Sequence, residues 1–313
     1  MKLMSRKSVF ISLFIFSFLF FVYWTFPYEV IKESVTSEIS RSTGMNVFIK
    51  SLGPNFPFGI EANGVQLESG VAGVAAELQA VDVNVSVPWL ALGQLKLIVS
   101  VEGPKGKGTL DLATRLSLLS MVSGKPLMPS MIMFEADEFP LDNFVKFLLA
   151  YVSTGPGANP MIAPLLAKIG FTGKLNANID LDLDVGEPTQ SNGTLEIKFS
   201  DASLILSDPS LALPDQKFSK ALIRARLDSG TLAFDDASGL TAEELDFGLQ
   251  GRVTLRPVLP SSMLDLKLPI KLSGGLQSSF GFILGAISGG ASNGSELTYG
   301  IRGTLGEVQA NPI

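Results

Sequence analysis

Three aspartates at every second position, Asp180, Asp182 and Asp184, have the spacing best suited to bind a cation. Carboxylates are preferred calcium ligands, and an EF-hand loop places them at alternate positions. That loop requires glycine directly after the third acidic position, where this chain has Val185. Because apolar residues alternate with the aspartates over 179–185, we interpret the carboxylates as the solvated face of a strand. We therefore predict no metal site here.

A second motif with chemical potential is Gly290-Ala-Ser292-Asn-Gly294, which matches the G-x-S-x-G nucleophile pattern. Such a serine needs a histidine as its base, and the chain contains no histidine. It also contains no cysteine, which excludes thiolate nucleophiles, thiolate zinc sites and disulfides. The acidic pairs at 235–236 and 243–244 could be glycosidase carboxylates, but such pairs are common on acidic surfaces. We expect no enzyme and no cofactor.

The distribution of charge argues against a nucleic-acid partner. The chain has 24 basic and 30 acidic side chains, and Lys2, Arg6 and Lys7 precede the first apolar segment. Without those three, residues 8–313 carry 21 basic and 30 acidic groups, a balance of −9. Domains that bind nucleic acids present a basic surface to the phosphates. We therefore expect partners of another kind.

The first apolar segment, Val9–Phe26, contains 18 residues and no charge. At about 1.5 Å of rise per residue, such a helix nearly crosses the roughly 30 Å hydrocarbon layer of a bilayer. Tyr23, Trp24 and Tyr28 cluster at its end, as aromatic residues do at the interface between lipid and water. A cleaved signal peptide would need small residues at a cleavage site, and none lie there. We predict a single transmembrane anchor, with 1–26 as cytoplasmic tail and anchor.

The orientation of this anchor follows from the flanking charges. Three basic residues precede the apolar segment, whereas Lys32 and Arg41 are the only basic residues close after it. Basic residues favour the cytoplasmic side of a membrane helix. The N-terminus is therefore expected in the cytoplasm, and residues 27–313 across the membrane.

A short helix is expected directly after the anchor, over 27–44. Pro27 is favoured in a first helical turn, and Gly44 can end the helix as a C-cap. The segment has an apolar stripe with helical spacing, formed by Tyr28, Ile31, Val35 and Ile39. This stripe fits a helix that packs on its own domain and equally a helix that lies on the membrane surface.

From Met45 onward the hydrophobic period changes to two, which is typical of strands with one dry and one wet face. Asn-Gly at 63–64 and 192–193, and Asp-Ser-Gly at 228–230, favour the turns of antiparallel hairpins. We predict a mainly β protein whose curved, largely antiparallel, amphipathic sheet forms an open groove or half-barrel with a few short helices. The clearest candidates for a face that binds lipid or a partner are Val81, Val83, Val85 and Val87.

The β pattern is interrupted once, over 139–170. Two segments there, 140–151 and 160–170, have the composition of short helices. They divide the body into an N-terminal β half, 45–138, and a C-terminal β half, 171–313. We favour one continuous sheet with a helical insertion, although periodicity also allows two domains.

Two glycine-rich blocks, 173–204 and 218–257, carry a resemblance to a known family. The first contains a G-x-L … G-T-L ribbon, and the second reads R-x-x-x-x-S-G-T-L-x-F followed by G-x-x-G-x-V-T-L. The chain also has FPYEVIKESV after the anchor and YGIRGTL at Tyr299–Leu305. Together these features resemble protein N of the type II secretion system, the GspN family, in its longer form.

This resemblance implies a bacterial inner-membrane protein with a single span, a cytoplasmic N-terminus and a periplasmic body. Such a protein would be an accessory of the type II secretion system that acts through contacts with other secretion components. It would perform no reaction. The order of anchor, short helix and long amphipathic β ribbons is also similar to AsmA-like proteins, whose curved sheets form apolar grooves for lipid chains. The alternative is therefore a lipid-binding or lipid-transfer module with acyl chains as partners.

Overall fold

Two helices open the chain, α1 (Arg6–Thr25) and α2 (Tyr28–Thr43). Helix α1 includes all residues of the expected anchor, Val9–Phe26, except Phe26. Within the described part of the chain, no helix meets the length and apolarity expected of a membrane span. The computed structural model describes residues 6–43, 45–56, 58–68, 75–92, 94–117, 129–146, 169–184, 187–206, 215–278 and 296–313.

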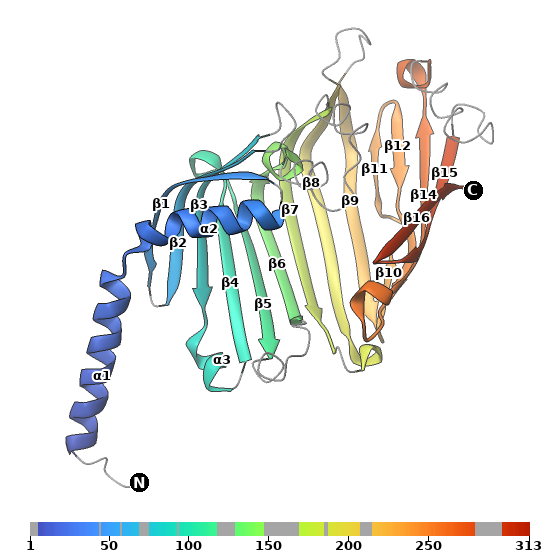
Figure 1. Ribbon diagram of the computed structural model, residues 1–313. Helices are drawn as coiled ribbons and strands as arrows, with labels where there is room; N and C mark the ends of the chain where they lie inside the picture. The colour runs from blue at the N-terminus through green and yellow to red at the C-terminus, as the bar shows by residue number, and fades with distance from the viewer. Residues whose placement is uncertain are drawn as a thin grey trace.

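The rest of the described chain is dominated by strands, which confirms a mainly β protein with a few short helices. All 16 described strands belong to one sheet with antiparallel pairing, and Figure 1 shows them side by side in a curved array. The strands are β1 (Asn46–Asn55), β2 (Gly59–Glu68), β3 (Ala75–Val85), β4 (Gln94–Glu102), β5 (Thr109–Ser117), β6 (Pro129–Pro140), β7 (Ile169–Asp182), β8 (Asn192–Leu206), β9 (Gln216–Asp228), β10 (Thr231–Phe234), β11 (Gly239–Ala242), β12 (Leu245–Gly248), β13 (Gln250–Thr254), β14 (Met263–Leu272), β15 (Glu296–Thr304) and β16 (Glu307–Pro312).

The sheet is essentially a meander in which each strand pairs with the next one along the chain. Strands β10 and β11 both pair with β9, and β12 and β13 both pair with β14, so each couple acts as one interrupted strand. Strands β6 and β7, on either side of the insertion, pair directly. The two β halves are therefore parts of a single sheet.

The insertion itself is only partly within the described residues. A helix occupies 141–146 in the first expected helical segment. The second expected helix, 160–170, lies outside the described residues except for 169–170. Those two residues begin β7, where they pair with the end of β8. The prediction of helix at this point is wrong, because the pairing extends the strand toward the insertion.

The three turn signals have different outcomes. Asp228 ends β9, and positive φ angles at Ser229 and Gly230 form the tight turn into β10, as predicted. Asn192-Gly193 follows a turn and already begins β8. Asn63-Gly64 lies inside β2, where Gly64 has a φ of 60° and the flanking residues remain paired with β1 and β3. The prediction of a turn at 63–64 is therefore wrong, since cross-strand pairing on both sides holds the glycine within the strand.

Helix α2 covers the outer edge of β1. The Glu29 carboxylate accepts a hydrogen bond from the Leu52 N–H at 3.0 Å, and the Ser40 hydroxyl accepts one from the Val47 N–H at 3.2 Å. Lys32 Nζ donates to the Lys50 carbonyl at 3.2 Å. An edge strand otherwise presents unpaired backbone groups that invite aggregation. The helix therefore packs on its own domain, which is one of the two arrangements that the apolar stripe allowed.

Short 3₁₀ helices and one short α-helix complete the connections between strands. These are α3 (Val87–Ala91), η1 (Pro104–Gly106), η2 (Pro188–Gln190) and η3 (Leu259–Ser261). Val87 was expected to continue a strand with Val81, Val83 and Val85. It begins α3 instead, because Pro88 cannot donate to the sheet and is well tolerated in a first helical turn.

We predict that the edge contact of α2 depends on pH through Glu29. Hydrogen bonding to Lys32, and then to the Leu52 N–H, lowers the pKa of Glu29. A carboxylate whose pKa is lowered by folding contributes stability above its unfolded pKa of about 4.3, and this contribution is lost as the pH falls through the folded value. Glu29→Gln should therefore lower the free energy of unfolding at pH 7, with a smaller difference from wild type in acid.

Denaturant titrations of the full chain in detergent would measure this difference at neutral pH and near pH 3. Glu33→Gln is the matched control, because Glu33 is an exposed residue of the same helix with no polar partner among the described residues. Equal effects of the two substitutions at neutral pH would contradict the role assigned to Glu29.

Candidate functional site

One face of the sheet, here called the inner face, is apolar across most of its width. Cross-strand pairing aligns its side chains in rows that run perpendicular to the strands. One row, from β2 to β10, consists of Ile60, Val83, Val99, Leu112, Phe134, Ile179, Leu195, Ala225 and Phe234. A neighbouring row contains Val81, Val101, Leu110, Ala136, Ala177 and Ile197.

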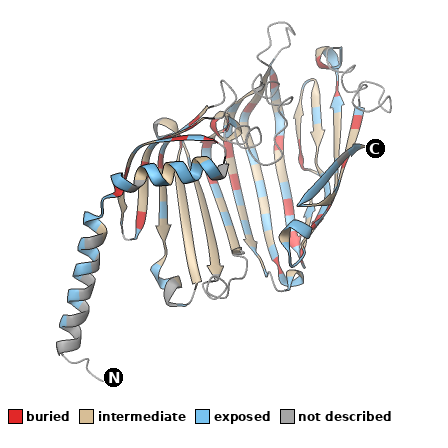
Figure 2. Cartoon of the chain, viewed as in Figure 1, coloured by how far each residue is buried: buried red, intermediate tan, exposed pale blue. Residues whose placement is uncertain are grey.

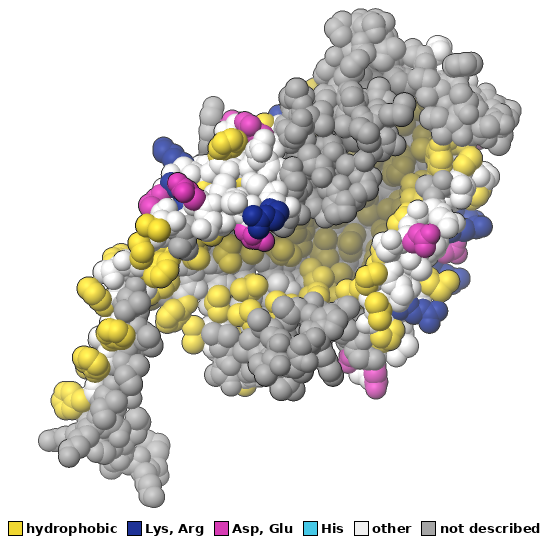
Figure 3. Space-filling view, viewed as in Figure 1, with side chains coloured by type: hydrophobic (Ala, Val, Ile, Leu, Met, Phe, Trp, Pro, Cys, Tyr) yellow, Lys and Arg dark blue, Asp and Glu magenta, His cyan; other side chains and the backbone are white. Residues whose placement is uncertain are grey.

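The inner face is not sealed by a second layer among the described residues. Val83 is 37% exposed, and Val81 and Val85 are half-buried. Most strand positions have intermediate exposure in Figure 2, and Figure 3 shows a hollowed surface lined by hydrophobic side chains. Apolar surface that stays accessible over such a width marks a site for another molecule.

Two clusters of buried side chains lie in the described part of the chain. One cluster joins Tyr28 of α2 to β1–β3, and the other joins Phe139 and Leu175, with 2% and 1% exposure, on β6 and β7. These clusters fix α2 and the centre of the sheet. The second cluster includes Ala136 and Ala177 of the neighbouring row, whereas Val83 of the first row stays exposed.

The opposite, outer face is polar, and it holds two of the three regularly spaced aspartates. Asp180 pairs with Thr194 across β7 and β8, and Asp182 forms an ion pair with Arg115 at 3.4 Å. This confirms the prediction of a solvated strand face. In the described part of the chain, no group of three His, Cys, Asp or Glu side chains could hold a metal ion.

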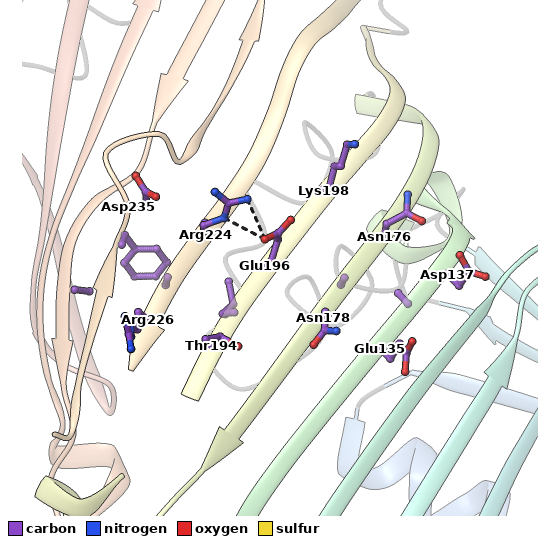
Figure 4. A pocket seen from close by; sticks show the side chains of 16 residues that line it. Glu135, Asp137, Asn176, Asn178, Thr194, Glu196, Lys198, Arg224, Arg226 and Asp235 are labelled. Carbon is purple, nitrogen blue, oxygen red and sulfur yellow. Dashed lines mark hydrogen bonds and ion pairs between the residues drawn. The ribbon is translucent and has the colours of Figure 1, made fainter. Parts of the chain in front are cut away.

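A hollow of about 1010 Å³ lies on this outer face, and Figure 4 shows its lining. Its side chains are mainly charged or amide groups from β6 to β10. Arg224 contacts Glu196 through Nε at 3.1 Å and through a terminal nitrogen at 3.0 Å. The Asp235 carboxylate accepts the N–H of Ala237 at 2.9 Å. These contacts neutralise charge and shape a turn, and they bring no nucleophile next to a base.

The acidic pairs considered as possible carboxylate catalysts also have structural roles. The Glu244 carboxylate accepts hydrogen bonds from the N–H groups of Gly275 and Leu276 at 2.9 and 3.0 Å, which caps a helix over 274–278.

Asp82, elsewhere on the outer face, has a pKa raised by burial and then by the Glu61 carboxylate across the strand pair. The serine motif at 290–294 lies outside the described residues.

The aromatic residues expected at a membrane interface have separate environments. Trp24 and Phe26 are 57% and 44% exposed, whereas Tyr28 is only 7% exposed and belongs to the core below α2. Burial, and then the neighbouring Tyr23, raises the pKa of Tyr28. Tyr28 forms the first buried contact of α2, and its expected place at a membrane interface stays a prediction. The side chain of Val9, the first residue of the expected anchor, lies outside the described part of the structure.

Comparisons with known proteins find no relative: no family model, no curated protein and no solved structure matches the chain. The resemblance of 173–204 and 218–257 to the GspN family therefore stays a prediction from motifs. The inner face is the feature of the structure that bears most on function. The sequence indicated this face only through the alternation of apolar and polar residues within single strands. The extension of that alternation into rows became visible through the strand register.

We predict that the inner face is reachable from solution in the folded protein. The chain has no cysteine, so each single-cysteine variant carries one reactive thiol. Val83→Cys should react with a small water-soluble maleimide at nearly the rate of the unfolded chain in delipidating detergent. Leu175→Cys is the matched control and should react many times more slowly, because Leu175 is 1% exposed. Equal protection of both thiols would show that the inner face is a closed core.

Proposed function

We propose that this protein is a membrane-anchored lipid-binding module whose inner face forms an open groove for acyl chains. The observation that carries this proposal is the pair of apolar rows on the inner face, of which one runs unbroken from β2 to β10 and contains the exposed Val83. A soluble protein normally covers such a surface with a second layer. A groove that holds acyl chains replaces that layer with ligand.

The width of the inner face suits a long, flexible apolar ligand. Neighbouring strands lie about 4.8 Å apart, so the eight strands from β2 to β9 span roughly 35 Å. Each methylene removed from water contributes about 0.8 kcal/mol, so ten of them would contribute about 8 kcal/mol. A gain of this size exceeds the lower estimates of the cost of immobilising a ligand. No specific polar contact is needed for binding.

The location we propose is a bacterial inner membrane, with the N-terminus in the cytoplasm and the sheet in the periplasm. Support comes from the uncharged segment Val9–Phe26 and from the large apolar side chains that α1 presents outward. Among these, Phe10 and Phe14 are 70% and 72% exposed. An isolated helix with such a surface would be stabilised by lipid around it.

The lipid proposal predicts that the full-length protein, purified in mild detergent, retains phospholipid or free fatty acid detectable by native mass spectrometry. Leu112→Glu should reduce that occupancy at least about tenfold, because a charge beneath an acyl chain costs more than about 1.4 kcal/mol. Ser100→Glu is the matched control, since Ser100 occupies the outer face of the adjacent strand and should leave occupancy unchanged. Lipid-free protein in repeated preparations would contradict the proposal.

A second candidate is the accessory role in type II secretion, and the two edges of the sheet favour it. Helix α2 caps β1, whereas β16 pairs only with β15 in the described sheet. A free edge strand can accept a strand from a partner, with backbone hydrogen bonds providing affinity. We propose that β16 is the edge at which a secretion component would join the sheet.

This second candidate predicts that a clean deletion of the gene reduces export of secreted proteins, and that expression of the wild-type chain restores it. Secretion components should also co-purify with the full-length protein in mild detergent. Export at the wild-type level in the deletion strain would exclude the role in secretion. It would leave the lipid-binding proposal standing.

A further inference from the structure

At the strand ends near α1 lie exposed apolar side chains that belong neither to the inner face nor to the buried clusters. Phe56, in the turn between β1 and β2, is 71% exposed, and Phe58 is 40% exposed. The connection between β3 and β4 adds Val87 and Leu92, with 41% and 70% exposure. We call these four side chains, together with Trp89, the apolar rim.

The two parts of the apolar rim lie at the same end of neighbouring strands. The Val85 N–H donates to the Phe58 carbonyl at 2.9 Å, only two residues before α3 begins. Trp89 of α3 lies beneath the Arg115 guanidinium, 5.0 Å from the ring centre, which orients the indole. Figure 1 shows α3 at the ends of β3 and β4, at the end of the sheet toward which α1 extends.

The last turn of α1 is joined directly to this rim. The Tyr23 hydroxyl contacts the carbonyls of Asn55 and Gly59 and accepts the Gly59 N–H at 3.1 Å. Its ring lies 6.1 Å from the ring of Phe58, measured between centroids. Tyr23 thus holds both ends of the β1–β2 turn. Wherever the last turn of α1 lies along the membrane normal, the turn carrying Phe56 and Phe58 lies close to the same level.

The two ends of the strands differ in charge. No charged residue occurs over 51–60 or 83–95, the segments that contain the apolar rim. At the opposite end, the connection between β4 and β5 contains Lys107, and Glu138 lies nearby on β6; both are exposed. Uncharged segments with exposed aromatic rings match the interface of a bilayer, where such rings are favoured.

We propose that the apolar rim inserts into the membrane interface beside α1, so that the protein holds the bilayer through a second contact at one end of its groove. This inference rests on the proposed anchoring of α1 in the membrane. The partner is the lipid surface rather than a second copy of the chain, because Tyr23 makes the rim continuous with the anchor. Acyl chains could then pass between the bilayer and the inner face without crossing water.

Quenching by brominated lipids tests this proposal, because the chain contains only two tryptophans, Trp24 and Trp89. Full-length protein would be reconstituted in phosphatidylcholine vesicles with bromine atoms near the head group. One variant, Trp89→Phe, reports on the anchor through Trp24. A second, Trp24→Phe with Trp89→Phe and Phe56→Trp, reports on the rim. A third carries Val308→Trp in the same tryptophan-free background and serves as the control, since Val308 is exposed on the distant strand β16.

We expect Trp24 and the Phe56→Trp indole to lose most of their fluorescence in brominated vesicles, and the Val308→Trp indole to lose little. Quenching of Trp24 without quenching at position 56 would overturn this inference and leave the anchor intact. No quenching at either position would overturn both. Equal quenching at positions 56 and 308 would also overturn it, because the sheet would then lie flat on the membrane instead of contacting it by one end.

Discussion

The structure depends on hydrophobic side chains that cross-strand pairing aligns without a second layer to cover them. A meander of antiparallel strands satisfies its own backbone, so a wide sheet can persist with few buried clusters. Buried residues form one cluster around Tyr28 and another around Leu175. Between these clusters, Val83 and its neighbours expose apolar surface to water, which is unfavourable in free energy. A ligand with apolar chains would remove that surface from water.

The periodicity of the sequence was sufficient to predict the strands and their two faces, since alternation with period two depends only on local geometry. It also placed Asp180 and Asp182 on the solvated face, and it located the turn at 228–230. The errors occurred where neighbours decide. Pairing on both sides holds Asn63-Gly64 within β2, and Pro88 favours the start of helix α3 at Val87. Strand register, which creates the continuous rows, could not be read from any single strand.

The two edges of the sheet differ from each other, and so do the two ends of its strands. Helix α2 closes the β1 edge because Glu29 and Ser40 accept hydrogen bonds from backbone N–H groups of β1, while β16 is paired on one side in the described chain. One end of the strands carries Phe56 and Leu92, and the other carries Lys107. These asymmetries distinguish the strand ends near α1 from the opposite ends, and the β1 edge from the β16 edge.

The most direct test of an acyl-chain groove is photo-crosslinking of the full-length protein, reconstituted in vesicles, with a phospholipid that carries a diazirine in its acyl chain. The labelled positions would be mapped by peptide mass spectrometry. The account predicts labels on inner-face residues such as Val99, Leu112 and Ile179, and none on outer-face residues such as Ser100 and Asp111. Labels confined to α1, or equal labelling of both faces, would contradict it.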